Sequence, residues 1–370
     1  MQTIQPGRRI CLTMESGLVR GLVWLAVAMS MSMSMGGCFR RVENEGVPAT
    51  ESVPIDRSVV VYSALDREFA EPVLKDLAKQ AGVSLRSKFD VESTKTVGLT
   101  NTLIAESVQP RCDLFWNNEI LNTIRLKERG LLQPYRPRHA GDVPAAFKDP
   151  DGNWYGFAAR ARILLVNTKS VPEADRPKGL ADLVNPRWKG KIGIAKPLFG
   201  TTATQAACLF AAWGEEKAKA FFRELKANEV QVFSGNKQVA TAAGSGQIAL
   251  GLTDTDDATG EIEAGSPVAI VYPDREPGQL GTLFIPNTLA MMKGAPHPEA
   301  ARRLADLIVS PEVEAALAQG PSAQVPLLNG TKKPAQVETP ATVHPMDVDF
   351  QAAAKLWDQA AVFLTAEFAE

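Results

Sequence analysis

Three carboxylates crowd one short stretch of the chain. Asp254, Asp256 and Asp257 come directly after a predicted strand at 247–252. In an extended chain Asp254 and Asp256 project to the same side, and like charges this close together are costly unless a positive group compensates them. Carboxylate oxygens hold a hard metal cation or the ammonium group of a ligand. We expect a cation site here; the alternative is an acidic turn in which Asp257 caps the segment that runs to Gly265.

Two arginines, Arg160 and Arg162, lie on a predicted strand at 157–167. Side chains two residues apart on a strand share a face, and two guanidiniums at the mouth of a cleft bind an oxyanion through paired hydrogen bonds. The alternative is an exposed edge pair that is solvated or ion-paired with Asp or Glu. Together with the carboxylates, the arginines predict a ligand with both signs of charge, either a metal ion with an anion or a zwitterion such as an aminophosphonate or amino acid.

Small polar residues precede or open three predicted helices. They are Thr94, Thr201, Thr202 and Asn236. Backbone N–H groups and hydroxyls at a helix N-terminus bind anions, but the same residues also serve as ordinary helix caps. Tyr62, with Ser63 beside it, and Trp116 follow strand ends, where they would supply an aromatic wall and cation–π contact with an ammonium. For Trp116, packing in the core is the alternative.

Composition excludes several classes of function. The 370 residues include 40 Lys and Arg against 42 Asp and Glu, which leaves no field for binding nucleic acid or an anionic membrane surface. The three His are isolated and no CxxC pair occurs, so neither a zinc nor a redox site is expected. Without a GxSxG elbow, an HExxH motif or a Gly-rich phosphate loop, we expect neither catalysis nor a cofactor.

The N-terminal segment is typical of export. Three Arg precede an apolar run at 21–35 that leads into Gly36-Gly37-Cys38, and this order is that of a secretory signal. The Met-Gly-Gly-Cys sequence resembles a bacterial lipobox, with Met where Leu is usual. We predict a lipoprotein-type signal peptide at 1–37, a lipidated Cys38 and a tether at 38–57; cleavage without lipid is the alternative, and Met14 is a second plausible start.

Strands and helices alternate along the remaining chain. A buried-type strand near Val59, a helix at 68–80 and a strand at 83–89 form the first of several βα units, which predicts an α/β fold with largely parallel sheets. Two extended apolar segments, 155–166 and 282–292, are candidates for hinge strands between two lobes. A further amphipathic helix is predicted at 350–368. Cys112 and Cys208 are expected to be small buried residues, although an oxidising compartment would permit a disulfide.

Four segments resemble the ferric-iron branch of periplasmic solute-binding proteins, which is related to polyamine- and thiamine-binding proteins. They are 60–63, 156–162, 182–192 (DLVNPRWKGKI) and 304–317, and the resemblance extends over about 58–330. It implies a two-lobed type II periplasmic-binding-protein fold that closes about hinge strands. The first lobe would hold 58–157 and about 285–318, and the second 158–284 and about 319–370.

The ligand residues of that branch are only partly present. Its adjacent tyrosines are replaced by Thr253-Asp254-Thr255-Asp256-Asp257, Asp66 stands in the place of a His, and Asn118 or Glu119 in the place of an acidic ligand. The resemblance thus implies a metal site built from Asp66, Glu119, Asp254, Asp256 and Asp257, with a synergistic anion on Arg160 and Arg162.

These expectations combine into one function. The chain is expected to be an extracytoplasmic, lipid-anchored, monomeric receptor that delivers Fe³⁺ or another hard cation to an ABC permease and its ATPase. The alternative ligand is a zwitterionic or cationic organic solute, including a polyamine. Enzymes on the same fold and signalling receptors are the rival classes.

Overall fold

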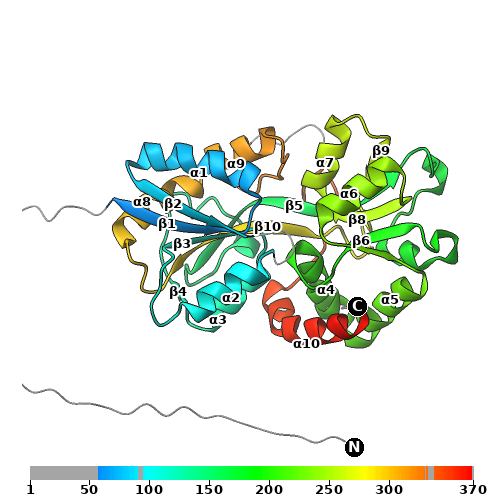
Figure 1. Ribbon diagram of the computed structural model, residues 1–370, viewed down its shortest axis with the longest axis horizontal. Coiled ribbons are helices and arrows are strands. Elements are labelled where there is room, and N and C mark those ends of the chain that lie inside the picture. The colour runs from blue at the N-terminus through cyan, green and yellow to red at the C-terminus, as the bar shows by residue number, and fades with distance from the viewer. Residues whose placement is uncertain (1–56, 91–94, 330, 332–336, 369–370) are drawn as a thin grey trace, which may run out of the picture. The chain divides into compact units, whose positions relative to one another are not determined.

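The computed structural model describes residues 57–90, 95–329, 331 and 337–368. The predicted signal peptide, the tether up to residue 56, Cys38 and Thr94 lie outside these residues. Within the described part, ten strands form one connected sheet system with helices on its faces (Figure 1). No helix in these ranges is both long and apolar enough to cross a lipid bilayer.

The first lobe is built around a sheet in which parallel strands are followed by one antiparallel strand. Its strands, in spatial order, are β2 (Ser84–Phe89), β1 (Ser58–Ser63), β3 (Leu114–Asn117) and β10 (Phe284–Met292), with β4 (Leu132–Gln133) also on β10. Its helices are α1 (Arg67–Ala81), α2 (Val97–Ala105), α3 (Leu121–Glu128), α8 (Pro298–Ile308) and α9 (Pro311–Gln319). Helix α1 ends where Gly82 adopts φ +64°, a left-handed conformation that glycine takes without steric cost.

The second lobe has a similar mixed sheet. Its strands are β5 (Trp154–Asn167), β6 (Ile192–Ala195), β7 (Gln231–Phe233), β8 (Leu250–Asp254) and β9 (Val268–Val271). Its helices are α4 (Gly200–Trp213), α5 (Glu215–Ala227), α6 (Asn236–Ser245) and α7 (Thr255–Glu263). Short 3₁₀ helices η2 (Ala145–Phe147), η3 (Glu173–Asp175), η4 (Leu180–Val184) and η5 (Pro186–Trp188) lie in the connections.

Two strands join the lobes, as the sequence predicts. The first half of β5 pairs antiparallel with β10, and its second half pairs with β8 and β9. The register of the β5–β10 pairing shifts between Pro286 and Asn287 of β10. On β5, the residue at this irregularity is Ala158, which has φ +44°. Figure 1 shows β5 and β10 running between the two lobes. The lobes therefore meet at the middle of β5, where its partner changes from β10 to β8 between Ala161 and Arg162.

Helix α10 (Phe350–Phe368) occupies the predicted amphipathic segment and contacts both lobes. Phe363 packs against Phe210 of α4 at a centroid distance of 6.0 Å. Asp358 forms an ion pair of 2.7 Å with Arg125 of α3. Helix α10 thus packs on α3 of the first lobe and on α4 of the second (Figure 1).

Cys112 and Cys208 are buried free thiols, as expected of small apolar residues. Burial raises the pKa of both thiols. Neither forms a disulfide.

Candidate ligand-binding cleft

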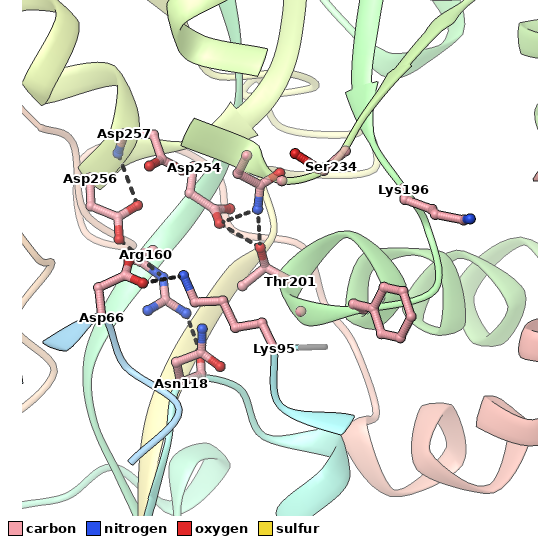
Figure 2. Close-up of a pocket in the computed structure, with 15 residues that line it drawn as sticks. Asp66, Lys95, Asn118, Arg160, Lys196, Thr201, Ser234, Asp254, Asp256 and Asp257 are labelled. Atoms are coloured by element: carbon pink, nitrogen blue, oxygen red, sulfur yellow. Dashed lines mark hydrogen bonds and ion pairs between the residues drawn. The ribbon is translucent and has the colours of Figure 1, made fainter. Parts of the chain in front are cut away.

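A small polar cavity of about 30 Å³ lies where β5, β8 and the starts of α4, α6 and α7 face the first lobe (Figure 2). It is lined by Asp66, Lys95, Asn118, Arg160, Ala195, Lys196, Phe199, Gly200, Thr201, Ser234, Gly235, Asn236, Asp254, Asp256 and Asp257. A single water needs about 10–15 Å³ of such volume. The cavity therefore suits an ion with a few ligand atoms better than an extended organic molecule.

The three predicted aspartates come together, although not in the predicted geometry. Strand β8 ends at Asp254, and α7 begins at Thr255, so Asp256 and Asp257 lie in the first helical turn rather than on an extended chain. One carboxylate oxygen from each of the three lies within 4.8 Å of the others. Asp254 and Asp256 are buried, with 4% and 8% of their surface exposed. The turn into α7 thus brings all three carboxylates to one point at the edge of the sheet.

Arg162 is buried behind the cavity and bonded only to protein atoms. It lies opposite Asp254 in the β5–β8 pairing, and Nη1 donates to Asp254 Oδ1 at 2.8 Å. Its other acceptors are Gln205 at 3.0 Å, Asn236 at 3.2 Å, and Thr201 and Thr202 at 3.3 Å each. Its exposure is zero. Arg162, predicted to bind an anion in the cleft, thus lies behind the cavity in this structure, where its guanidinium holds Asp254 in place.

The protonation of Asp254 follows from that network. Burial by itself would raise its pKa, but the charges of Arg162 and Arg160 and a hydrogen bond from Thr201 outweigh burial and lower it. Asn236 Nδ2 also donates to Asp254 Oδ2, at 3.0 Å. Asp254 is thus an ionised carboxylate whose oxygens already have partners.

Arg160 is the arginine that reaches the cavity. Because β8 ends opposite Arg162, Arg160 lies beyond it on β5 and faces the first turn of α7, where Nε is 3.7 Å from Asp256 Oδ2. Nη2 donates to the carbonyl oxygen of Asn118 in the first lobe. Arg160 Nε and Asn118 Oδ1 are both buried and have no hydrogen-bond partner among the described residues. A donor and an acceptor are therefore available in the cleft.

Burial dominates the chemistry of the other two aspartates. It raises the pKa of Asp256 to about 7, and the negative charges of Asp254 and Asp66 act in the same direction against the opposing charge of Arg160. Burial, with the charges of Asp256 and Asp254, also raises the pKa of Asp257. A bound cation would stabilise the ionised forms of both carboxylates.

The first lobe contributes an ion pair to the cavity. Lys95 Nζ lies 2.7 Å from Asp66 Oδ1, and Figure 2 shows the lysine side chain extended to Asp66. The carbonyl oxygen of Lys95 accepts the N–H of Gly200 at 3.2 Å. Gly200 has φ +57°, a conformation that favours glycine. The start of α4 in the second lobe is thereby bonded to the first lobe.

Several predicted site residues lie outside the cavity. Glu119, predicted as a metal ligand, is fully buried and accepts hydrogen bonds from Asn117 Nδ2, from the N–H groups of Leu121 and Asn122, and from Thr204. Its carboxylate therefore satisfies the N-terminus of α3 and does not face the cleft. Thr202 lies one layer back, against Arg162 and Asn236.

The predicted aromatic wall does not form. The Tyr62 hydroxyl donates to Glu106 at 3.0 Å, and Lys88 Nζ lies 4.8 Å from its ring centroid. Trp116 is fully buried against Phe157 at 5.1 Å. Ser63 is also fully buried and does not line the cavity. These residues belong to the core of the first lobe.

Lys95 and Lys196 are cavity residues that the sequence reasoning did not select. Lys95 follows Thr94 in a polar segment before a helix, and Lys196 follows the end of β6. Ligands bind beyond the carboxyl ends of strands in open α/β sheets. Applied to β6, that rule indicates Lys196. No local pattern indicates Lys95, because its place at the cavity depends on how the first lobe faces the second.

Known proteins resemble this chain in sequence. The profile of the family described as "Bacterial extracellular solute-binding protein" matches residues 111–353. Iron uptake protein A1 of Synechocystis is 27% identical over 301 residues, which are 78% of this chain and 81% of the relative. The Fe(3+)-binding periplasmic protein of Serratia marcescens is 26% identical over 204 residues, 55% of this chain; the chain thus spans only 58% of that relative.

Solved structures have the same two-lobed architecture. Iron-bound HitA of Pseudomonas aeruginosa superposes with a TM-score of 0.75 at 23% identity, covering 84% of this chain and 99% of HitA. AfuA of Actinobacillus pleuropneumoniae, with fructose-6-phosphate bound, has a TM-score of 0.75 at 22% identity, covering 84% and 98%. The predicted type II periplasmic-binding fold is confirmed, and the chain belongs to the bacterial extracellular solute-binding protein family.

Proposed function

We propose that this protein is the receptor of an ABC importer for a hard metal cation, with ferric iron as the leading cargo, bound between the lobes together with a small anion. The observation that carries the proposal is the group of three aspartate oxygens within 4.8 Å, at a cavity shared with Arg160. Hard cations take oxygen ligands, and carboxylates are prominent among these in proteins.

Charge balance supports an accompanying anion. Four carboxylates meet four cationic groups at or directly behind the cavity: Asp66, Asp254, Asp256 and Asp257 against Lys95, Arg160, Arg162 and Lys196. When all are ionised, their charges cancel, so a bare trivalent ion would add three uncompensated positive charges in a buried site. An anion that arrives with the metal offsets that charge, and the Arg160 Nε hydrogen is available to it.

The relatives support iron as the metal. Their names include iron uptake and Fe(3+)-binding proteins, and one solved neighbour holds iron and citrate. None of the four tyrosines lines the cavity, so phenolate ligands are not part of the proposal. The fructose-6-phosphate ligand of AfuA keeps an organic solute as the rival, which the small cavity volume disfavours.

Three further properties belong to the same proposal. The protein acts by binding and closure without chemical turnover, as a monomer that presents the closed lobes to the permease. It stays at the outer face of the cytoplasmic membrane through lipid on Cys38. A labelled-fatty-acid incorporation assay with a Cys38→Ala variant tests the anchor.

Thermal unfolding of the purified protein tests the ligand. The panel is Fe³⁺, Ga³⁺, Mn²⁺ and Zn²⁺, each with citrate, carbonate or phosphate, alongside sugar phosphates, amino acids and polyamines. A ligand present at 100 times its Kd stabilises the protein by about 2.7 kcal/mol. We expect trivalent ions to give the largest shift, and only with an anion. Stabilisation by an organic solute and by no metal would overturn the proposal.

Two variants and one spectrum sharpen the result. The double change Asp256→Asn with Asp257→Asn should abolish the metal shift, whereas the matched change at exposed Asp175 should leave it intact. A ferric site built from carboxylates lacks the visible charge-transfer band of iron–phenolate coordination. An iron–phenolate charge-transfer band in the visible spectrum would therefore contradict carboxylate ligation even if iron binds.

A further inference from the structure

Lys95 places a positive charge among the carboxylates that would hold the cargo. Its ammonium pairs with Asp66 at 2.7 Å, and 17% of the lysine side-chain surface is exposed. Its charge lowers the pKa values of Asp256 and Asp257 against the larger, opposing effect of burial. Lys95 therefore acts electrostatically on three of the four carboxylates at the cavity.

The backbone of Lys95 also takes part in a contact between the lobes. Its carbonyl oxygen accepts the Gly200 N–H at the start of α4, so the backbone from which the ammonium extends is bonded to the second lobe. The other lysine of the cavity is oriented differently. Figure 2 shows the Lys196 amine pointing away from the aspartate group.

We propose that the Lys95 ammonium is a tethered competitor that occupies the cation position of the closed, cargo-free cleft, and that an incoming metal ion must displace it. This inference rests on the proposed function. A lysine side chain has four rotatable carbon–carbon bonds, so the ammonium can leave while the backbone stays in place. Because the tether is intramolecular, the competitor is present at high effective concentration.

The consequence is a threshold for binding. Every cation meets the same displacement cost, so each apparent affinity is lowered by the same factor, and a weakly held ion such as Na⁺ or Mg²⁺ fails to bind at its ambient concentration. A trivalent ion gains more from the same carboxylates because Coulomb energy scales with charge. Lys95 thus sets a threshold that only strongly held cations pass, and it leaves the ratio of affinities between cations unchanged.

Titration of the purified protein with Ga³⁺ and Mn²⁺ in citrate at constant pH tests this inference. The variants are Lys95→Gln, Lys95→Arg and Lys196→Gln. Lys95→Gln should bind both cations about tenfold more tightly, the factor expected when one charge-assisted hydrogen bond no longer has to be broken. Lys95→Arg keeps the charge and should stay near wild type. Lys196→Gln should not tighten binding.

A rescue experiment separates competition from a structural effect. Lys95→Ala leaves room for a free ammonium, so ethylammonium should weaken Ga³⁺ binding in this variant more than sodium does at equal ionic strength, and should have no such effect on wild type. A Lys95→Gln variant that binds equally or more weakly, or a Lys95→Ala variant indifferent to ethylammonium, overturns the competitor role alone. Failure of wild type and all variants to bind any cation overturns the proposed function as well.

Discussion

Arg162 and Asp254 lie directly opposite each other on β5 and β8 and form a buried ion pair of 2.8 Å. Arg160, two residues earlier on the same face, has passed the end of β8 and meets Asp256 at the start of α7 instead. The length of β8 thus divides two similar arginines between two tasks. Arg162 stabilises the site from behind, and Arg160 faces the ligand cavity.

This division predicts that loss of Arg162 destabilises the folded protein. Arg162→Ala leaves Asp254 buried without its charge partner, which should destabilise the cargo-free protein by roughly 3–5 kcal/mol. Urea unfolding measures the loss. The control is Arg223→Ala, which removes an exposed pair with Glu367 and should cost less than about 1 kcal/mol. Equal effects of the two changes would contradict a structural role for Arg162.

Asp256 should make the cargo-free protein less stable as pH rises. Its pKa is raised to about 7 in the folded protein and is near 3.9 when unfolded. Between these values the folded state binds more protons, so the contribution of this group is fully present below about pH 4 and is lost as pH rises through about 7.

Asp256→Asn removes that titration and keeps an oxygen acceptor for the Asp257 N–H. Relative to wild type, the variant should therefore be more stable at pH 8, and its advantage should shrink toward pH 5. Chemical unfolding of both proteins across this range gives the difference directly. A pH-independent difference would show that Asp256 does not titrate there.

Thr204 and Glu119 form a buried hydrogen bond of 2.9 Å between α4 of the second lobe and the start of α3 in the first. Thr204→Val keeps the shape and removes this bond, which exists only when the lobes meet. A hydrogen bond to a charged group contributes about 1.5–3 kcal/mol, so cargo affinity should fall at least tenfold.

Titration calorimetry with the preferred metal complex measures that loss of affinity. Thr102→Val is the matched control, because Thr102 donates only within α2, to the Gly98 carbonyl at 2.9 Å. Its cargo affinity should be unchanged. If both valine variants bind normally, the Thr204 contact does not contribute to closure.

Trp357 should anchor the C-terminal helix to α3 of the first lobe. It is 6% exposed, and the guanidinium of Arg125 in α3 lies 5.2 Å from its ring centroid. Trp357→Ala should cost roughly 3–5 kcal/mol of stability. Val362, on the same helix, is 74% exposed, so Val362→Ala should have little effect in the same thermal unfolding experiment.

Local sequence patterns were enough to predict most of the secondary-structure elements of this protein. Asp254, Asp256 and Asp257 directly after a predicted strand indicated a shared site, although the turn into α7 decided how the three carboxylates converge. The period of apolar residues indicated the βα units, the strands β5 and β10 that join the lobes, and α10. These features depend on neighbours along the chain, which the sequence displays.

Tertiary structure decided how the polar residues are used. Glu119 carries a carboxylate that could bind a metal. In the fold, however, this carboxylate accepts hydrogen bonds from the turn into α3 and from Thr204. Arg162 and Arg160 differ only in where β8 stops, and Lys95 meets Asp66 only because the fold brings these two segments together. A polar side chain binds whichever partners the fold brings near it, and for these residues the deciding partners lie far away in sequence.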